Sequence, residues 1–172
     1  MHIEHIAGDK MYIDYAGEKL HLVNKDTGEI TDVEVFISVL GASQLTYIEA
    51  THSQCKEDFI SCCEHALEYY GGVPMAIVPD NLRSAVTKSD RYEPTLNQAF
   101  ENFASHYSTT ILPARVYKPK DKAIVEGAVR IAYTRIYSVL DAKVFHTLQE
   151  MNDAIRVILE TYNDINLTDR PY

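Results

Sequence analysis

Short hydrophobic runs separated by turn residues occupy the first fifty positions of the chain. The runs are rich in Val, Ile, Tyr and Phe, which favours β-strands over helices. The turn at residues 25–29 contains Gly28, which can adopt a positive φ angle. We therefore expect an antiparallel meander of about three strands, at residues 10–16, 32–40 and 45–50, with residues 19–24 forming a second strand or an extension of the first.

From about position 51 the hydrophobic spacing becomes that of helices. The first helix is expected to end before Gly71 and Gly72, and an all-apolar run after it is typical of a strand buried on both faces. We expect helices at residues 51–70 (capped by Thr51 or Ser53, with Thr51…Gln54 as a capping box), 94–107, 121–140 and 147–162 (opened by the capping box Thr147…Glu150), and strands at 75–78 and 109–112.

The expected order is β-β-β-α-β-α-β-α followed by one further helix. Sequential strands and then alternation predict an α/β fold with a mixed five-stranded sheet and helices on both faces. This is the ribonuclease H-like arrangement, in which the first strand and the strand after the first helix lie side by side at the sheet centre. We divide the chain into a lead-in at residues 1–9, a ribonuclease H-like core at 10–143, and a C-terminal helix with the start of a linker at 144–172.

Three acidic residues occur at positions where a carboxylate needs a partner. Asp14 lies in the middle of the first strand, and Asp80, followed by Asn81, ends the strand after the first helix. Glu126 lies near the start of the helix at 121–140. An ionised carboxylate in an apolar strand costs free energy unless it is paired or binds a cation. Because the two strands are expected to be adjacent, the pattern predicts a divalent-metal site formed by Asp14, Asp80 and Glu126.

The net charge of −9 over 172 residues argues by itself against nucleic-acid binding. The distribution is uneven, however, because residues 114–143 contain seven Lys or Arg and three acidic residues, a net charge of +4 around Glu126. A basic rim around an acidic centre suits a phosphodiester held over metal ions, and a solvated basic helix face explains the same charges equally simply. The chain shows no membrane-spanning run and no signal peptide, so we expect a cytoplasmic protein.

Four stretches of the chain are specific in combination: MYIDYAG at 11–17, IVPDNLRSAV at 77–86, YKPKDKAIVE at 117–126 and ETYN at 160–163. Together they resemble the catalytic core of DDE transposases and retroviral-type integrases, and more narrowly the IstA-type transposase of the twenty-first insertion-sequence family. The resemblance spans roughly residues 10–165. It implies that Asp14, Asp80 and Glu126 are the catalytic and metal-binding residues, and that they hold two Mg²⁺ (or Mn²⁺) ions when DNA is bound.

The resemblance also implies a reaction and its partners. Water would first cut the DNA at the transposon ends, and the exposed 3′-OH would then attack target DNA. The full-length protein would act as a homo-oligomer in a synaptic complex on the bacterial nucleoid, with an ATPase helper protein. Expected DNA contacts come from Lys118, Lys120, Lys122, Asn81 and Arg130, although Lys122 could instead pair with Glu126 one turn away and Asn81 could be a cap.

Two other functions fit the same residues. The first is a ribonuclease H-like nuclease that cuts DNA without joining strands, and the second is a domesticated DNA-binding module without catalysis. Asp9 and Asp26 are alternatives to Asp14, but they lie at a strand end and in a turn.

The cysteines suggest neither a disulfide framework nor a zinc site. Their number is three, and Cys62 and Cys63 are adjacent, so they point to different faces of the expected helix. No Cys-x-x-Cys pair is present, so we expect apolar burial of cysteine rather than a zinc site built from His52, Cys55, Cys62, Cys63 and His65.

Overall fold

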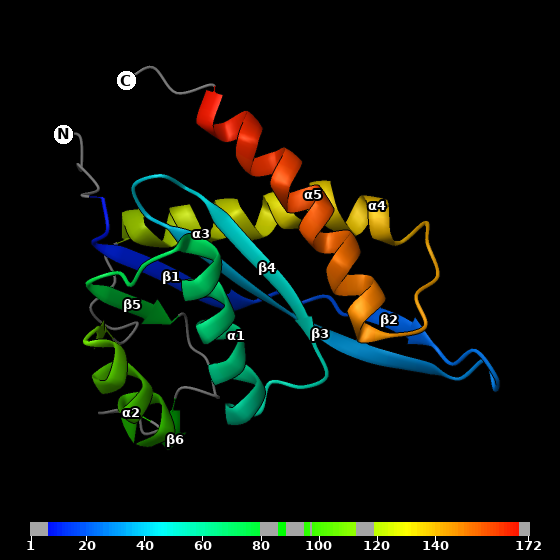
Figure 1. The fold of residues 1–172 in the computed structure, drawn as a ribbon, viewed down its shortest axis with the longest axis horizontal. Coiled ribbons are helices and arrows are strands. Elements are labelled where there is room, and N and C mark those ends of the chain that lie inside the picture. The colour runs from blue at the N-terminus through cyan, green and yellow to red at the C-terminus, as the bar shows by residue number, and fades with distance from the viewer. Residues whose placement is uncertain (1–6, 80–85, 89–94, 97, 113–118, 169–172) are drawn as a thin grey trace.

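The computed structural model describes residues 7–79, 86–88, 95–96, 98–112 and 119–168, and the remaining residues are drawn as a grey trace in Figure 1. A mixed six-stranded sheet forms its centre. The strands of this sheet are β1 (Lys10–Tyr15), β2 (Leu20–Val23), β3 (Ile30–Leu40), β4 (Thr46–Thr51), β5 (Ala76–Pro79) and β8 (Thr110–Ile111).

The sheet has one strand more than the five expected, because β2 is a separate strand and not an extension of β1. β3 is 11 residues long and pairs antiparallel with β1, β2 and β4, as the expected meander requires. The β1–β3 ladder ends with Tyr15 opposite Phe36, and the β2–β3 ladder begins with Leu20 opposite Val33. Residues 16–19 therefore span only two positions of β3. Ala16 still donates its N–H to the Val35 C=O at 2.9 Å, and the chain bulges after it.

β1 pairs in parallel with β5, and β5 pairs in parallel with β8. The first strand and the strand after the first helix are therefore neighbours, which confirms the expected centre of the sheet. Helices α1 (Lys56–Tyr70) and α2 (Gln98–Tyr107) supply the crossovers and cover one face. There Phe59 packs against Phe36 and Phe100, with ring centroids 6.2 and 4.9 Å away.

The opposite face of the sheet is covered by α3 (Pro119–Ala132), which lies behind the strands in Figure 1. Val125 and Ala128 of this helix are buried in one cluster with Tyr12 of β1. Because side chains alternate along a strand, Asp14 lies on the same face of β1 as Tyr12, the face that α3 covers. The fold thus places one expected metal ligand beneath the helix that carries another.

The expected helix at 121–140 is longer and not uniformly α-helical. α3 begins at Pro119 and passes into a π-helix at Tyr133–Tyr137 and then into α4 (Ser138–Leu140). A π-helix has i→i+5 bonding, which is rare and tends to occur at functional positions.

The last helix, α5 (Leu148–Thr168), begins with the expected cap. The Glu150 N–H donates to Thr147 Oγ1 at 3.1 Å, while the Glu150 carboxylate accepts the N–H of His146 at the same distance. The capping prediction at Thr147 is therefore confirmed, with the reciprocal bond displaced by one residue.

The other capping box, Thr51…Gln54, was wrong. Thr51 is the last residue of β4, so its backbone is committed to the strand, and α1 begins only at Lys56 without a side-chain cap. The helix expected at 94–107 begins at Gln98, and a small hairpin of β6 (Val86–Lys88) and β7 (Thr95–Leu96) precedes it unexpectedly.

Helix α5 is joined to β4, which among the described strands pairs with β3 alone. The side-chain amide of Asn152 bonds both the N–H and the C=O of Ala50, at 2.7 and 2.9 Å. Asn163 does the same to Thr46, at 3.1 and 2.9 Å. The two asparagines occupy backbone groups that a further strand would use. Within the described residues, no helix is both long and apolar enough to cross a membrane.

Candidate active site

Asp14 lies near the end of β1, half-buried on the face of the sheet that α3 covers. Its Oδ1 atom accepts the backbone N–H of Tyr15 at 2.8 Å, which holds the carboxylate close to its own backbone. The neighbouring residues Ile13 and Tyr15 are buried on the other face of the strand. The alternation of the strand therefore places the Asp14 carboxylate on the α3 side of a central strand.

Glu126 is exposed on α3, and it lines a hollow of about 240 Å³ together with Asp14. The other lining residues are Val125, Val129, Arg130 and Tyr133. The helical residues recur at spacings of three and four, so they form one stripe of α3 that continues to Tyr133. The structure therefore brings together Asp14 and Glu126, which are 112 positions apart in the sequence, as the sequence predicted.

Asp80 and Asn81 lie outside the described residues, and so does Lys118. The last described residue before Asp80 is Pro79, which pairs with Ile13, the residue before Asp14. The prediction for Asp80 therefore stays a prediction, and the described part of β5 ends beside the strand that carries Asp14.

The predicted DNA-contacting residues are only partly visible. Lys120 and Lys122 lie in the first turns of α3, and their side chains are not described. Arg130 is exposed and lines the hollow one turn after Glu126. A guanidinium at this position places a fixed positive charge beside two carboxylates and can bind a phosphate through parallel N–H bonds.

The hollow suits a hard divalent cation by its chemistry. Its described lining offers the carboxylate oxygens of Asp14 and Glu126, and neither thiol nor imidazole, which matches the oxygen ligands that Mg²⁺ prefers. Two carboxylates alone are an incomplete set. Accordingly, the described residues contain no group of three His, Cys, Asp or Glu side chains that could hold a metal ion.

Two residues near the candidate active site, Tyr133 and Glu18, were not predicted from the sequence. Tyr133 lines the hollow, and its hydroxyl accepts the backbone N–H of Glu18 at 3.0 Å. The only sequence signal for Tyr133 was its position two helical turns after Glu126. Glu18 had none, because its role depends on its backbone in the bulge between β1 and β2.

The expectation that cysteine is buried among apolar residues is confirmed for two of the three residues. Cys62 and Cys63 are buried and Cys55 is exposed, and none forms a disulfide. Burial, with Glu49 nearby, raises the pKa of the Cys62 thiol well above its usual range, so the thiol stays protonated. His65 is committed to a carboxylate, since its Nδ1 lies 2.9 Å from Glu49.

A larger hollow of about 500 Å³ lies between β4, α1 and α5. Its central carboxylate, Glu49, already contacts His65 and accepts a 2.8 Å hydrogen bond from the Tyr47 hydroxyl. None of the sequence motifs contributes a carboxylate to it except Glu160, in the last turns of α5. The smaller hollow at Asp14 is therefore the better candidate for the active site, because motif residues from two distant segments meet there.

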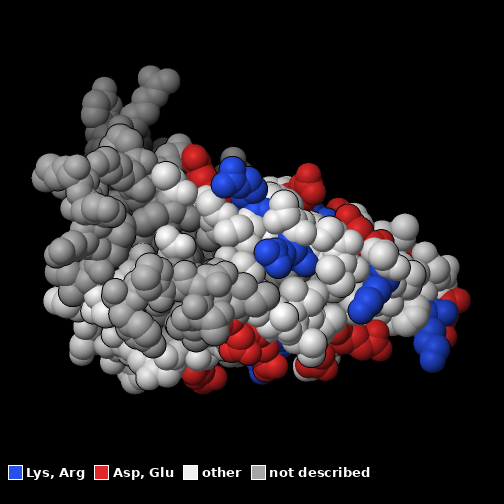
Figure 2. All heavy atoms as spheres, turned by 90° about the horizontal axis from the view of Figure 1, so that it is seen from above, with Lys and Arg blue, Asp and Glu red and all other residues white. Residues whose placement is uncertain are grey.

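Charge on the described surface is mixed. Figure 2 shows one face on which Lys and Arg side chains are separated by uncharged surface, with acidic groups along its borders. The described part of that face carries no continuous basic patch, which fits the net charge of −9. The described surface is therefore consistent with the interpretation that the basic residues of segment 114–143 form a solvated helix face.

Comparison with known proteins gives relatives of one kind. "Putative transposase y4bL/y4kJ/y4tB" of Sinorhizobium fredii is 46% identical over 160 residues, which are 93% of this chain and 31% of that protein. "Putative transposase for insertion sequence IS1162" of Pseudomonas fluorescens is 42% identical over 163 residues, 95% of this chain and 29% of that protein. "Transposase for insertion sequence element IS21" of Pseudomonas aeruginosa is 26% identical over 103 residues, 60% of this chain and 26% of that protein. The chain thus spans about a third of the length of these relatives. No family model matches it.

Solved structures show the same fold. The catalytic core domain of BIV integrase superposes with a TM-score of 0.65 at 13% identity, covering 96% of this chain and 88% of that one. The HTLV-2 integrase catalytic core domain, solved in complex with magnesium, gives 0.63 at 17% identity, covering 92% and 88%. The fold is therefore the ribonuclease H-like fold expected from the order of strands and helices. The resemblance that the motifs indicated is therefore confirmed: over nearly its whole length the chain is similar in sequence to putative transposases, and its fold is that of retroviral integrase catalytic cores.

Proposed function

We propose that this chain is the catalytic core of a DNA transposase, which cuts DNA at transposon ends and joins the resulting 3′-OH to target DNA with the help of divalent metal ions. The observation that carries the proposal is the meeting of Asp14 and Glu126 across one hollow beneath α3. Asp80 is proposed as the third ligand, because it follows the strand that pairs with β1. The transposase relatives and the magnesium-bound integrase core support this assignment.

The proposed residues have separate tasks. Asp14 is fixed on a central strand and would contribute to both of two ion positions, whereas Asp80 and Glu126 would each complete one. When bound, two Mg²⁺ or Mn²⁺ ions supply the charge that offsets the negative phosphodiester oxygens and favours attack by water or a 3′-OH. The same carboxylates serve cutting and joining, because only the attacking group differs between the two steps.

Residues around the carboxylates would bind and orient the DNA. Arg130 lies one turn from Glu126 on the lining of the hollow and would contact a phosphate beside the reacting one. Val125 and Val129 form the apolar part of the lining and reduce the access of water to the carboxylates. Lys118, Lys120 and Lys122, at the start of α3, are proposed to contact the DNA backbone further away.

The test replaces each carboxylate by its amide, in the protein that carries this chain. Asp14→Asn, Asp80→Asn and Glu126→Gln are each expected to lower cleavage and joining by at least about 10²- to 10³-fold. Glu101→Gln, an exposed carboxylate in the first turn of α2, is the matched control and should leave both activities unchanged. Near-normal activity of any one of the three variants would remove that residue from the site.

The assay also separates the other two functions. Pre-cut DNA ends are supplied with target DNA, so that joining is measured independently of cutting. A nuclease without strand transfer would cut DNA but give no joined product. A non-catalytic DNA-binding module would give neither product with Mg²⁺ or with Mn²⁺, while DNA binding would persist. Sedimentation with paired DNA ends, with and without an ATPase helper, tests the proposed homo-oligomer and partner.

A further inference from the structure

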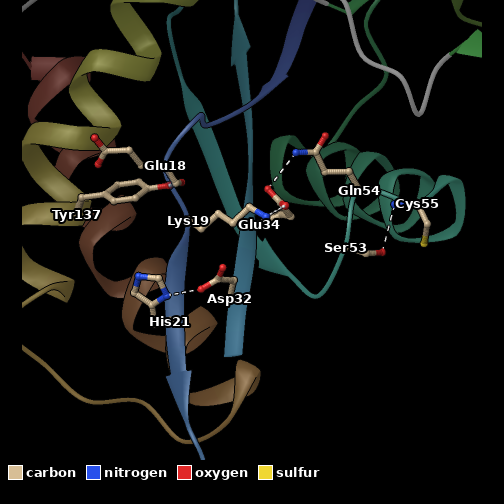
Figure 3. Close-up of polar contacts among 9 residues, drawn as sticks. All are labelled: Glu18, Lys19, His21, Asp32, Glu34, Ser53, Gln54, Cys55 and Tyr137. Carbon is tan, nitrogen blue, oxygen red and sulfur yellow. Dashed lines mark hydrogen bonds and ion pairs between the residues drawn. The ribbon is translucent and has the colours of Figure 1, made fainter. Parts of the chain in front are cut away.

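Two tyrosines of the π-helix hydrogen-bond the backbone of one residue, Glu18, in the bulge between β1 and β2. The Glu18 N–H donates to the Tyr133 hydroxyl at 3.0 Å, and the Tyr137 hydroxyl donates to the Glu18 C=O at 2.7 Å. The two rings lie against each other with centroids 4.8 Å apart. Figure 3 shows the ring of Tyr137 reaching from the helix side to Glu18. The backbone N–H and C=O of one residue, in two consecutive peptide units, are therefore both bonded by side chains from the same helix.

Glu18 is exposed and lies between the two ladders with β3, which stop at Tyr15 and resume at Leu20. The ladders therefore do not use its backbone groups, and the tyrosine hydroxyls bond them instead. Tyr137 is almost fully buried, and burial raises its pKa well above the usual range, so its hydroxyl keeps the proton that it donates.

A second set of polar contacts joins the bulge to β3 and to the segment before α1. Lys19 Nζ lies 3.1 Å from a carboxylate oxygen of Glu34, and the Gln54 amide donates to the other oxygen of the same carboxylate at 2.9 Å. Figure 3 shows this carboxylate between the bulge and the segment that leads into α1. The position of the bulge relative to β3 is thus set, and the tyrosines then fix the π-helix relative to the bulge.

The two tyrosine–Glu18 hydrogen bonds link the segments that carry the two carboxylates of the candidate active site. Glu18 follows Asp14 by four residues, and Tyr133 follows Glu126 by seven. Tyr133 also lines the same hollow as both carboxylates. α3 also meets the sheet here through apolar contacts such as Val125 against Tyr12, which are not directional. The two hydrogen bonds are directional, and they act between segments that carry Asp14 and Glu126.

We propose that Tyr133 and Tyr137 are positioning residues that set the separation between Asp14 and Glu126 by fixing α3 and the π-helix against the bulge at Glu18. The inference rests on the proposed function of the two carboxylates. The π-helix has a physical role in it, because it carries both hydroxyls to the backbone of one residue, Glu18. A displacement of about 1 Å at a reacting centre can lower a rate by about 10²-fold. A small shift of α3 relative to β1 would therefore be enough to lower the rate of catalysis.

The test uses Tyr133→Phe, Tyr137→Phe and the double variant, which remove the hydroxyls and keep the packed rings. Tyr70→Phe is the matched control, because it removes a part-buried hydroxyl that bonds Ser38 and Leu45 on the other face of the sheet. Amide hydrogen exchange at Glu18 is measured in the metal-free protein. We expect Tyr133→Phe to accelerate it about 5- to 10-fold, the effect of one lost hydrogen bond, and Tyr70→Phe to leave it unchanged.

Turnover is then measured with DNA ends and Mg²⁺ in the protein that carries this chain. The double variant is expected to lower kcat about 10- to 100-fold while KM for DNA changes less than about twofold, because the hydroxyls contact protein and not substrate. Crystal structures of the metal-free double variant and of the Tyr70→Phe control should differ in the distance between Asp14 and Glu126. A merely structural role would lower stability in all variants without changing kcat or this distance.

Failure of this inference is distinguishable from failure of the proposed function. Unchanged kcat and an unchanged carboxylate distance in the double variant, with Asp14→Asn inactive, would overturn the positioning role and leave the active site intact. Full activity of Asp14→Asn would instead overturn the proposed function. An equal loss of kcat in Tyr70→Phe and in the double variant would also overturn the inference, since the effect would then not be specific to the bulge.

Discussion

Asn163 joins α5 to the sheet, and its replacement by alanine should destabilise the whole domain. The side chain is buried and accepts the Thr46 N–H at 3.1 Å, while its amide nitrogen donates to the Thr46 C=O at 2.9 Å and to the Tyr69 hydroxyl at 2.6 Å. Thr46 lies in β4, and no strand of the described part of the chain pairs with the outer edge of β4. One side chain therefore completes the hydrogen bonding of a buried backbone position.

The magnitude follows from these three hydrogen bonds. Each contributes about 1 kcal/mol net, and an unsatisfied buried N–H or C=O costs about 1–3 kcal/mol. Thr46 is only 3% exposed, so water can replace the lost partner only if α5 moves away. The better helix propensity of alanine offsets about 0.5 kcal/mol. We expect the free energy of unfolding to fall by about 3 kcal/mol in Asn163→Ala.

Urea denaturation followed by circular dichroism measures this change. With a slope of about 2–3 kcal/mol per molar urea for a domain of this size, the midpoint should fall by about 1–1.5 M. Asn163→Asp keeps the acceptor for Thr46 but loses both donated bonds, and should not recover the wild-type midpoint. Asn102→Ala is the control, because Asn102 is exposed on α2 and its loss should change stability by less than about 0.5 kcal/mol. A midpoint shift in Asn163→Ala no larger than that of the control would refute the argument that this residue holds α5 to β4.

The remaining predictions concern metal, charge, alkali and thiols. Mn²⁺ should raise the melting temperature modestly, because an ion that binds only the folded state stabilises it by mass action. The rise should vanish in Asp14→Asn and become smaller in Glu126→Gln. An unchanged rise in Asp14→Asn would show that the ion binds elsewhere. Because few phosphates can be neutralised by a chain of net charge −9, DNA binding by this chain alone should be weak with a shallow salt dependence, and tight sequence-specific binding in a salt titration would contradict this. Iodoacetamide should label Cys55 rapidly and the buried Cys62 and Cys63 only on unfolding, as mass spectrometry can show. Burial raises the pKa of four tyrosines, Tyr15, Tyr47, Tyr70 and Tyr137, above the usual value of 10.0, so above pH 10 the folded state keeps protons that the unfolded state loses. In urea denaturation, these tyrosines should leave the free energy of unfolding unchanged below pH 10 and lower it above pH 10. A constant free energy of unfolding up to pH 11 would contradict this prediction.

Local pattern was sufficient for much of the architecture. The apolar run that became β5 and the strand that carries Asp14 were both predictable, because strand propensity and period depend on neighbouring residues. The cap at Thr147 was predictable for the same reason, since donor and acceptor are three residues apart. The capping box at Thr51 was wrong because β4 extends to that residue, and pairing with Glu34 of β3 outweighed the local preference.

Asp14 could be selected from the sequence because an ionised carboxylate in an apolar strand costs free energy without a partner, and Glu126 because it lies in a basic motif at the start of a helix. Their meeting across one hollow depends on the side of the sheet to which α3 packs, and this is decided by the burial of Val125 and Ala128 against Tyr12.

Other features were decided only by the tertiary structure. Tyr133 and Tyr137 hydrogen-bond Glu18, which lies 115 and 119 positions before them in the sequence. Asn163 hydrogen-bonds Thr46, which lies 117 positions before it. A tyrosine in a helix or an asparagine near its end carries no local signal of such a partner. Contacts of this kind depend on how the helices settle on the sheet, because a hydrogen bond is sensitive to distances of a few tenths of an ångström, whereas the hydrophobic pattern specifies only which face is buried. The sequence by itself thus determined the strands, helices and chemical groups of this protein, and the packing of α3 and α5 decided which of those groups meet.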